Sequence, residues 1–179
     1  RKLPGIKFNC EEQIKLLTKL VYGEEFINFV QEVKKLNNIN NFDINNSSFA
    51  PGDSDFLYQF VRHIKPKKII EIGGGYSSLI IDRAIKKNDM EQKFKTSHII
   101  VDPYTNPLLE TFKNKNIIQN KVENSKINWD KDLNKNDLLF IDSSHVIRPQ
   151  GDVLFQFLEV LPQLNKGVFV HVHDIFSPY

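Results

Sequence analysis

A short apolar run that ends in a carboxylate and three consecutive glycines constrains this chain more than any other feature. Residues 68–78 read KIIEIGGGYSS. The isoleucines are typical of a buried parallel strand, where β-branched side chains are covered on both faces. The glycines that follow allow backbone angles and close approaches that a Cβ atom would block. The segment therefore predicts a strand, a turn and a helix, with a ligand lying against the main chain of the turn.

Glu71 separates two classes of cofactor that both use such glycine turns. In the dinucleotide pattern G-x-G-x-x-G, a pyrophosphate lies on the helix N-terminus and a third glycine lets helix and strand pack closely. Ser78 stands where that third glycine would be, and Glu71 lies two residues before Gly73. A carboxylate there repels a phosphate but accepts hydrogen bonds from hydroxyl or amino groups. The alternative is a glycine-rich turn that binds nothing.

Strand and helix patterns alternate along most of the chain. Strands are predicted at residues 68–72, 97–102, 116–122, 137–142 and 167–174. Helices are predicted at residues 54–64, 77–87, 107–114 and 152–161. This alternation predicts an α/β fold with a Rossmann-like, doubly wound, mostly parallel sheet and right-handed crossovers.

The N-terminal part of the chain has a different pattern. Apolar residues recur at three- and four-residue spacing within residues 11–36, which predicts one or two amphipathic helices that cover the domain. The asparagine-rich stretch after them marks a loop, because asparagine favours turns over helix interiors. We therefore predict an N-terminal helical extension at residues 1–46 and a ligand-binding α/β domain at residues 47–179.

Charge and composition exclude several classes of partner. The 24 basic and 22 acidic residues give a net charge of +2, too small for a field that attracts nucleic acid or an anionic membrane. No apolar run approaches the roughly 20 residues that span a bilayer, and the first residues lack the apolar core of a signal peptide. The single Cys10 cannot form an internal disulfide. We expect a soluble, cytoplasmic protein that binds a small molecule, and a homo-oligomer is left open.

Acidic side chains recur at the carboxyl ends of the predicted strands, where ligands bind in open α/β sheets. Asp102 ends the second strand and suits hydrogen bonding to the two hydroxyls of a ribose, although a turn before Pro103 also explains it. Tyr104 can then flank an adenine. Glu123, after the third strand, is a candidate for lining the adenine pocket or equally a solvated loop carboxylate.

Two further strand ends carry carboxylates and histidines. Asp142 and Asp174 each follow an apolar run, and a buried carboxylate is costly unless it is paired. In one mechanism both hold Mg²⁺ or another divalent cation, which lowers the pKa of a substrate hydroxyl. In the other, His145 or His173 removes the proton as general base. Alternation puts His171 and His173 on one face of the sheet, and the lack of a cysteine–histidine pattern disfavours zinc.

Together these segments resemble the class I S-adenosylmethionine-dependent methyltransferases, from about residue 47 to residue 179. The pattern Glu-x-Gly-x-Gly resembles the first motif of that class. Four blocks in order, FAPGD at 49–53, EIGGGYSS at 71–78, FIDSSH at 140–145 and HVHDIF at 171–176, resemble a bacterial group similar to macrocin-type and cephalosporin-biosynthesis methyltransferases. Those enzymes methylate hydroxyls of sugars or natural products with a divalent metal.

The resemblance implies an S-adenosylmethionine-dependent O-methyltransferase that acts on a small hydroxylated substrate. It implies that the cofactor contacts Glu71, Gly73, Gly75 and Asp102. Their positions in the glycine turn and at the strand ends make further candidates for cofactor contact of Gly74, Tyr76, Ser77, Tyr104, Glu123 and Asp142. The resemblance also implies metal ligands at Asp142 and Asp174, with no clear third ligand. His145, His173 and Asp174 are the candidate catalytic residues.

The chain departs from the class in its length. A class I sheet normally has seven strands and ends in an antiparallel hairpin, whereas five strands are predicted here, so we expect a fragment that lacks the last strands. Two other functions stay open. The glycine turn also fits a nicotinamide-dependent oxidoreductase, and a non-catalytic binding module can keep the same fold.

Overall fold

The computed structural model of the chain describes residues 7–36, 42–104, 106–112 and 116–175. Within them, five strands form one all-parallel sheet in the order β3-β2-β1-β4-β5. The strands are β1 (Lys68–Ile72), β2 (Ser97–Val101), β3 (Asn116–Ile118), β4 (Leu138–Ile141) and β5 (Phe169–Val172). The prediction of a Rossmann-like parallel α/β fold is confirmed.

The order of the strands reverses between β1 and β4. From β1 the chain adds β2 and β3 on one side, and then returns to add β4 and β5 on the other. The loops after β1 and β4 therefore leave the sheet side by side, with the Asp142 amide donating to the Ile72 carbonyl at 2.8 Å. A crevice at such a reversal is where open α/β sheets bind their ligands.

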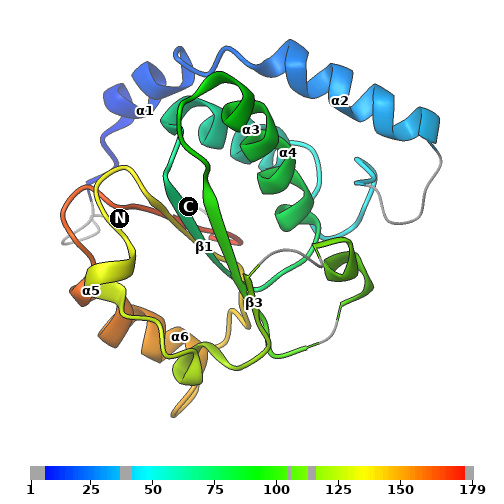
Figure 1. Cartoon of the computed structure of the whole chain (residues 1–179). Helices are drawn as coiled ribbons and strands as arrows, with labels where there is room; N and C mark the ends of the chain where they lie inside the picture. Colours follow the sequence, from blue (N-terminus) through cyan, green and yellow to red (C-terminus); the bar gives the residue numbers. More distant parts are fainter. Residues whose placement is uncertain (1–6, 37–41, 105, 113–115, 176–179) are drawn as a thin grey trace.

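Helices from the first half of the chain cover one face of the sheet (Figure 1). The helices α3 (Asp53–Ile64) and α4 (Tyr76–Glu91) pack directly on it. The helices α1 (Cys10–Leu17) and α2 (Gly23–Leu36) lie across the outside of this layer. Of the one or two helices predicted within residues 11–36, the structure has two.

The opposite face is covered by shorter elements from the second half of the chain (Figure 1). They are α5 (Trp129–Asp132), α6 (Asp152–Phe155), a π-helical turn η3 (Gln156–Val160) and α7 (Leu161–Gln163). The 3₁₀ turn η1 (Pro107–Phe112) joins β2 to β3 and packs near α4, whereas the 3₁₀ turn η2 (Val122–Asn124) contributes Val122 to the second layer. The predicted helix at 152–161 is therefore interrupted by a π turn.

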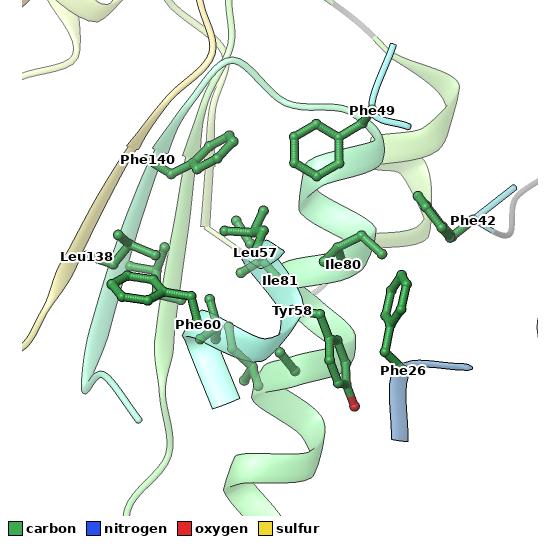
Figure 2. Packing of buried hydrophobic residues seen from close by; sticks show 14 of the residues in the cluster. Phe26, Phe42, Phe49, Leu57, Tyr58, Phe60, Ile80, Ile81, Leu138 and Phe140 are labelled. Carbon is green, nitrogen blue, oxygen red and sulfur yellow. The ribbon is translucent and has the colours of Figure 1, made fainter. Parts of the chain in front are cut away.

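The central strands are apolar on both faces because both faces are covered. Ile69 and Phe140 face α3 and α4, whereas Ile70 and Leu139 face the second layer. Figure 2 shows the first of these clusters, in which aromatic side chains from the helices pack against β4. Each fully buried side chain of this size stabilises the fold by roughly 1.5–3 kcal/mol.

The helix α2 shares this core with the α/β domain. Phe26 and Phe29 on α2 belong to the same cluster as Phe140 on β4. The buried Arg62 on α3 also connects α2 to α4. Its guanidinium donates to Glu25 on α2 and to Glu91 on α4, each at 2.6 Å. Residues 23–36 therefore pack as part of the same body as residues 53–91.

Four predicted strands are longer than the observed ones, and for two of them the difference exceeds two residues. The strand predicted at 116–122 ends at Ile118, because the chain turns at Asn120 and enters η2 at Val122. The strand predicted at 167–174 is confined to Phe169–Val172, since Gly167 and Asp174 have positive φ angles of 94° and 55°. The helix predicted at 107–114 is a 3₁₀ turn that ends at Phe112, and residues 113–114 lie outside the described residues.

The outer surface carries a few features relevant to partners. Within the described ranges no further strand pairs with the outer edge of β5, where Phe169 and Val170 are 37% and 40% exposed. Cys10 is exposed at the start of α1. The described helices include none with the length and apolar character needed to cross a bilayer.

Candidate functional site

Two adjoining cavities open beyond the carboxyl ends of β1, β2 and β4. The first, here called the Tyr104 cavity, has a volume of about 220 Å³ and lies among the loops after β2, η2 and β4. The second, the glycine cavity, has a volume of about 250 Å³ and lies along the turn after β1. Gly73, Asp102 and Asp142 line both cavities. The two cavities thus form one crevice at the reversal of strand order.

The three glycines of the turn have different environments. Gly73 has a φ of +86°, and a Cβ atom there would lie 1.7 Å from the Asp142 carbonyl oxygen. A Cβ atom on Gly74 would lie 2.9 Å from side-chain carbons of Ile100 and Leu109. A Cβ atom on Gly75 would have no other atom within 4 Å, and Gly75 lines the glycine cavity. The first two glycines allow the loops to pack, whereas the third leaves room for a ligand.

Asp102 is held at the wall between the two cavities. Its Oδ2 accepts from the Gly74 amide at 2.8 Å, and its Oδ1 accepts from the Tyr104 amide at 2.7 Å. The predicted neighbours Tyr104 and Glu123 line the Tyr104 cavity, and the Tyr104 ring is 79% exposed. Since each carboxylate oxygen has two lone pairs, Asp102 keeps capacity to accept hydrogen bonds from hydroxyls in the crevice.

Glu71 lies beneath the glycine turn. It is fully buried and is not among the residues that line either cavity. Its carboxylate accepts from the Ser77 hydroxyl at 2.6 Å and pairs with His98 Nε2 at 2.8 Å. These contacts fix Ser77 in the first turn of α4, beside Tyr76, and both residues line the glycine cavity. A direct contact between Glu71 and a ligand stays a prediction, while its positioning of the turn is present in the structure.

His98 was missed by sequence analysis. The feature of the sequence that could have identified His98 is a polar residue within the otherwise apolar strand β2. Its side chain lies on the side of the strand that contacts Glu71. Its Nδ1 is buried and has no hydrogen-bond partner among the residues that the structure describes.

Four predicted residues meet where β4 and β5 end. One ligand-type atom from each of Asp142, His145, His173 and Asp174 lies within 4.8 Å of the others, and we call this group the strand-end cluster. Asp142 Oδ1 lies 3.0 Å from His145 Nε2 and 3.3 Å from His173 Nδ1. The Asp174 carboxylate lies 3.7 Å and 3.6 Å from the same two nitrogens. Asp142 thus joins the cluster to the crevice.

The loop after β4 is held by the helical layer. Asp152 on α6 accepts from the Ser144 amide at 2.9 Å and from the Ser144 hydroxyl at 2.6 Å. Burial raises the pKa of Asp152, but these hydrogen bonds outweigh burial and hold it below the usual value. Gln156, in the π turn, is fully buried and hydrogen-bonds to the Ser143 hydroxyl. His145 then projects from a left-handed backbone with a φ of 55°.

His171 and His173 lie on the same face of β5, as predicted, but in different surroundings. The His171 ring packs against Phe56 and Phe140, and burial lowers its pKa to about 4. His173 instead faces the cluster, and its other ring nitrogen, Nε2, lies 3.5 Å from the Asp53 carboxylate. Asp53 is the first residue of α3 and belongs to the FAPGD block. The sequence indicated no catalytic or ligand-binding role for this block.

Other residues of the crevice have no signal in the sequence. Ser48 and Phe49 reach the glycine cavity from the loop before α3. Lys121 and Arg148 reach the Tyr104 cavity from loops after β3 and β4. Loop residues of this kind are brought to a site by the packing of the elements they connect.

Comparisons with known proteins identify a family and two similar chains. A family model described as "Methyltransferase domain" matches residues 70–175. An uncharacterized protein of Archaeoglobus fulgidus is 27% identical over 139 residues, covering 74% of this chain, and the chain spans 60% of that relative's length. The SAH-bound methyltransferase PaMTH1 of Podospora anserina aligns with a TM-score of 0.48 and 15% identity, over 96% of this chain and 73% of that one. Because the family model covers more than half of the chain, the chain belongs to the methyltransferase-domain family.

Proposed function

We propose that this chain binds S-adenosylmethionine and methylates a hydroxyl of a small molecule, such as a sugar or a natural product. Membership of the methyltransferase-domain family supports the reaction class. The observation that carries the cofactor assignment is the crevice itself, in which Gly75 leaves open space and Asp102 is fixed between two cavities. The hydroxyl acceptor and the bacterial subgroup rest on the resemblance of the four sequence blocks.

The residues of the crevice fit the parts of this cofactor. Tyr104 and Glu123 would flank the adenine in the Tyr104 cavity, and Asp102 would accept from the ribose hydroxyls. The methionine part would lie in the glycine cavity against Gly75, Tyr76 and neighbouring turn residues. The carboxylates on the walls favour a ligand with a cationic sulfonium, because opposite charges attract.

A nicotinamide dinucleotide fits the same turn less well. Its pyrophosphate needs free amides at the N-terminus of the helix after β1. The Gly74 amide already donates to Asp102, and the Gly75 amide donates to the Ser78 hydroxyl at 3.1 Å. These two amides therefore already donate to side chains of the protein, which favours a ligand without phosphate.

In this proposal the substrate hydroxyl loses its proton at the strand-end cluster. S-adenosylmethionine, when bound, supplies a methyl group to the substrate oxygen as its carbon–sulfur bond breaks and S-adenosylhomocysteine leaves. His145 or His173 can take the proton as general base, with Asp174 or Asp142 orienting the ring. A divalent cation held by Asp142 and Asp174 would instead lower the pKa of the hydroxyl. The two modes compete for Asp142 and Asp174, which would orient the histidine rings in the first mode and hold the cation in the second.

Calorimetry with S-adenosylhomocysteine tests the cofactor assignment, because this product needs no acceptor substrate. We expect one binding site per chain and no heat from NAD⁺ under the same conditions. Transfer of a labelled methyl group to a panel of sugars and phenols then tests the hydroxyl acceptor. Binding of NAD⁺ with none of S-adenosylhomocysteine would favour the oxidoreductase. Cofactor binding without any transfer would favour a non-catalytic module.

A further inference from the structure

We infer that the strand-end cluster is a centre for a first-row transition-metal ion, from Mn²⁺ to Zn²⁺, rather than for Mg²⁺. Its ligands are Asp142, His145, His173 and Asp174, and Asp53 supports His173 from behind. Only the role of this metal in catalysis rests on the proposed methyltransferase function. The binding of the metal is a separate property of these five side chains.

The spacing of the four ligand atoms fits a single small ion. Two ligands that each lie about 2.1 Å from one ion are about 3.0–3.4 Å apart at octahedral or tetrahedral angles. The distances from Asp142 Oδ1 to His145 Nε2 and His173 Nδ1 are 3.0 and 3.3 Å. The Asp174 oxygens lie 3.6 and 3.7 Å from the same nitrogens. Small side-chain rotations bring such atoms to one ion, and the two histidines supply the further ligands that the sequence lacked.

The kind of donor atom selects the metal. Mg²⁺ prefers an octahedral shell of oxygen ligands and is usually held by carboxylates and water. Imidazole nitrogen suits zinc, iron, cobalt and similar ions, whose affinity for mixed nitrogen and oxygen sites rises from Mn²⁺ towards Cu²⁺. This cluster offers two nitrogens and two carboxylates. The two histidines add imidazole nitrogens to the oxygen ligands predicted at Asp142 and Asp174.

Asp53 gives an independent indication. A histidine that ligates a metal usually presents its other ring nitrogen to a carboxylate or carbonyl, which sets the tautomer and the ring orientation. His173 is 6% exposed, with Nδ1 towards the cluster and Nε2 facing Asp53 at 3.5 Å. Asp53 comes from α3, some 120 positions earlier in the chain. Its placement behind the least exposed member of the cluster matches the arrangement usual for a metal-ligating histidine.

The cluster also keeps an open side. The side chains of Asp142, His145 and Asp174 are 28%, 33% and 49% exposed. Asp142 borders both the Tyr104 cavity and the glycine cavity. A catalytic metal site keeps at least one position free for water or substrate, unlike a closed structural site. A substrate oxygen can reach this cluster from the crevice in which the cofactor is proposed to bind.

The competing explanation is that the histidines are protonated and simply form ion pairs with the two carboxylates. The test uses the whole chain, stripped with a chelator and titrated by calorimetry with Mn²⁺, Co²⁺, Zn²⁺ and Mg²⁺ in turn. We expect one transition-metal ion per chain and an affinity for Mg²⁺ that is lower by about tenfold or more. Bound Co²⁺ should give visible absorption bands, a signature that ion pairs cannot produce.

Matched variants locate the site. His145→Gln and Asp174→Asn change partly exposed side chains and should each weaken Co²⁺ binding by about 100-fold. Asp53→Asn should weaken it by about tenfold, as expected of a supporting carboxylate. His63→Gln removes an imidazole on α3 outside the cluster and should leave binding unchanged. Melting temperatures of the metal-free variants show whether each one has folded.

Three results would overturn the inference: no binding of any transition metal, binding of Mg²⁺ as tight as that of Mn²⁺, or Co²⁺ binding that survives both His145→Gln and Asp174→Asn. An unchanged affinity in Asp53→Asn would remove the supporting role of Asp53. The same samples, in chelator, are titrated with S-adenosylhomocysteine. Cofactor binding without metal binding contradicts the metal centre alone, whereas metal binding without cofactor binding contradicts the proposed function alone.

Discussion

Gly73, Gly74 and Gly75 are identical residues that serve different purposes. A side chain on Gly73 would collide with the Asp142 carbonyl, and one on Gly74 would collide with Ile100 and Leu109. A side chain on Gly75 would meet only the cavity. The same contrast holds for histidines, because His173 faces the strand-end cluster while His171 packs between aromatic rings. Residue type alone does not distinguish these roles.

Gly75→Val and Gly73→Ala separate binding from folding. The φ of Gly75 is extended, so valine should be tolerated and should fill the space proposed for the ligand, weakening S-adenosylhomocysteine binding about tenfold or more. Alanine at Gly73 requires a left-handed φ and a clash, and should cost roughly 2–4 kcal/mol of stability. Calorimetry and urea unfolding measure the two effects. Unchanged affinity in Gly75→Val would place the ligand elsewhere.

His171 makes stability depend on pH in a defined window. Burial lowers its pKa in the folded protein to about 4, below its usual value of 6.5. Between these values the unfolded chain binds more protons, so the free energy of unfolding falls as the pH drops from 6.5 towards 4. This slope is at most about 1.4 kcal/mol per pH unit for one group.

His171→Phe should remove this contribution, because phenylalanine fits between Phe56 and Phe140 and does not titrate. Urea unfolding at intervals between pH 7 and pH 4 compares the variant with the natural chain. Above pH 6.5 the difference in the free energy of unfolding between the two proteins should be constant, and below pH 6.5 the natural chain should lose stability relative to the variant. Equal slopes in both proteins would contradict a buried neutral histidine.

At the scale of elements, the helical layers position the site through polar side chains in otherwise apolar contacts. Arg62 joins α2, α3 and α4, and its guanidinium also lies 4.4 Å from the centre of the Tyr22 ring. On the opposite face, α6 and the π turn hold the loop after β4 through Asp152 and Gln156. A π turn is costly in a regular helix and is often found at functional sites. Here it places Gln156 against the loop that carries Asp142.

Arg62→Met should loosen α2 from the rest of the molecule. The substitution leaves Glu25 and Glu91 without their shared partner, and because both are partly exposed we expect a loss of roughly 2–4 kcal/mol. Lys65→Met is the matched control, since it removes another cation from Glu91 at a more exposed position and should cost below about 1 kcal/mol. Chemical unfolding measures both. Equal costs would mean that Arg62 is no more important than a surface ion pair.

At the scale of the whole molecule, the reversal of strand order brings the site together. The glycine turn, Asp102 and Asp142 follow three different strands and meet because β1 lies between β2 and β4. Crossovers between parallel strands return the chain to the same edge of the sheet. The carboxyl ends of these strands therefore contribute to a single crevice, and the strand-end cluster adjoins it at Asp142, on the side of β5.

Ligand binding should stabilise the whole fold, because the crevice exists only in the folded chain. S-adenosylhomocysteine at about 100 times its Kd adds about 2.7 kcal/mol, or roughly 5–10 °C in Tm for a chain of this size. Differential scanning fluorimetry measures this shift. Gly75→Val should show a much smaller shift at the same concentration. A shift that is equal in both proteins would indicate binding outside the glycine cavity.

The sequence by itself determined the fold class, the strand–turn–helix unit at the glycines, and the residue types at each strand end. Those properties depend on local periodicity and on the conformational range of glycine, which neighbouring residues reveal. Strand ends at Ile118 and Val172 were not predictable, because turns after them depend on long-range packing. The sequence also could not show that Glu71 pairs with His98, or that Asp53 faces His173. Side chains far apart in sequence meet only when the sheet and its covering helices are assembled, so only the tertiary structure could show that the four residues predicted at the strand ends lie within reach of one another.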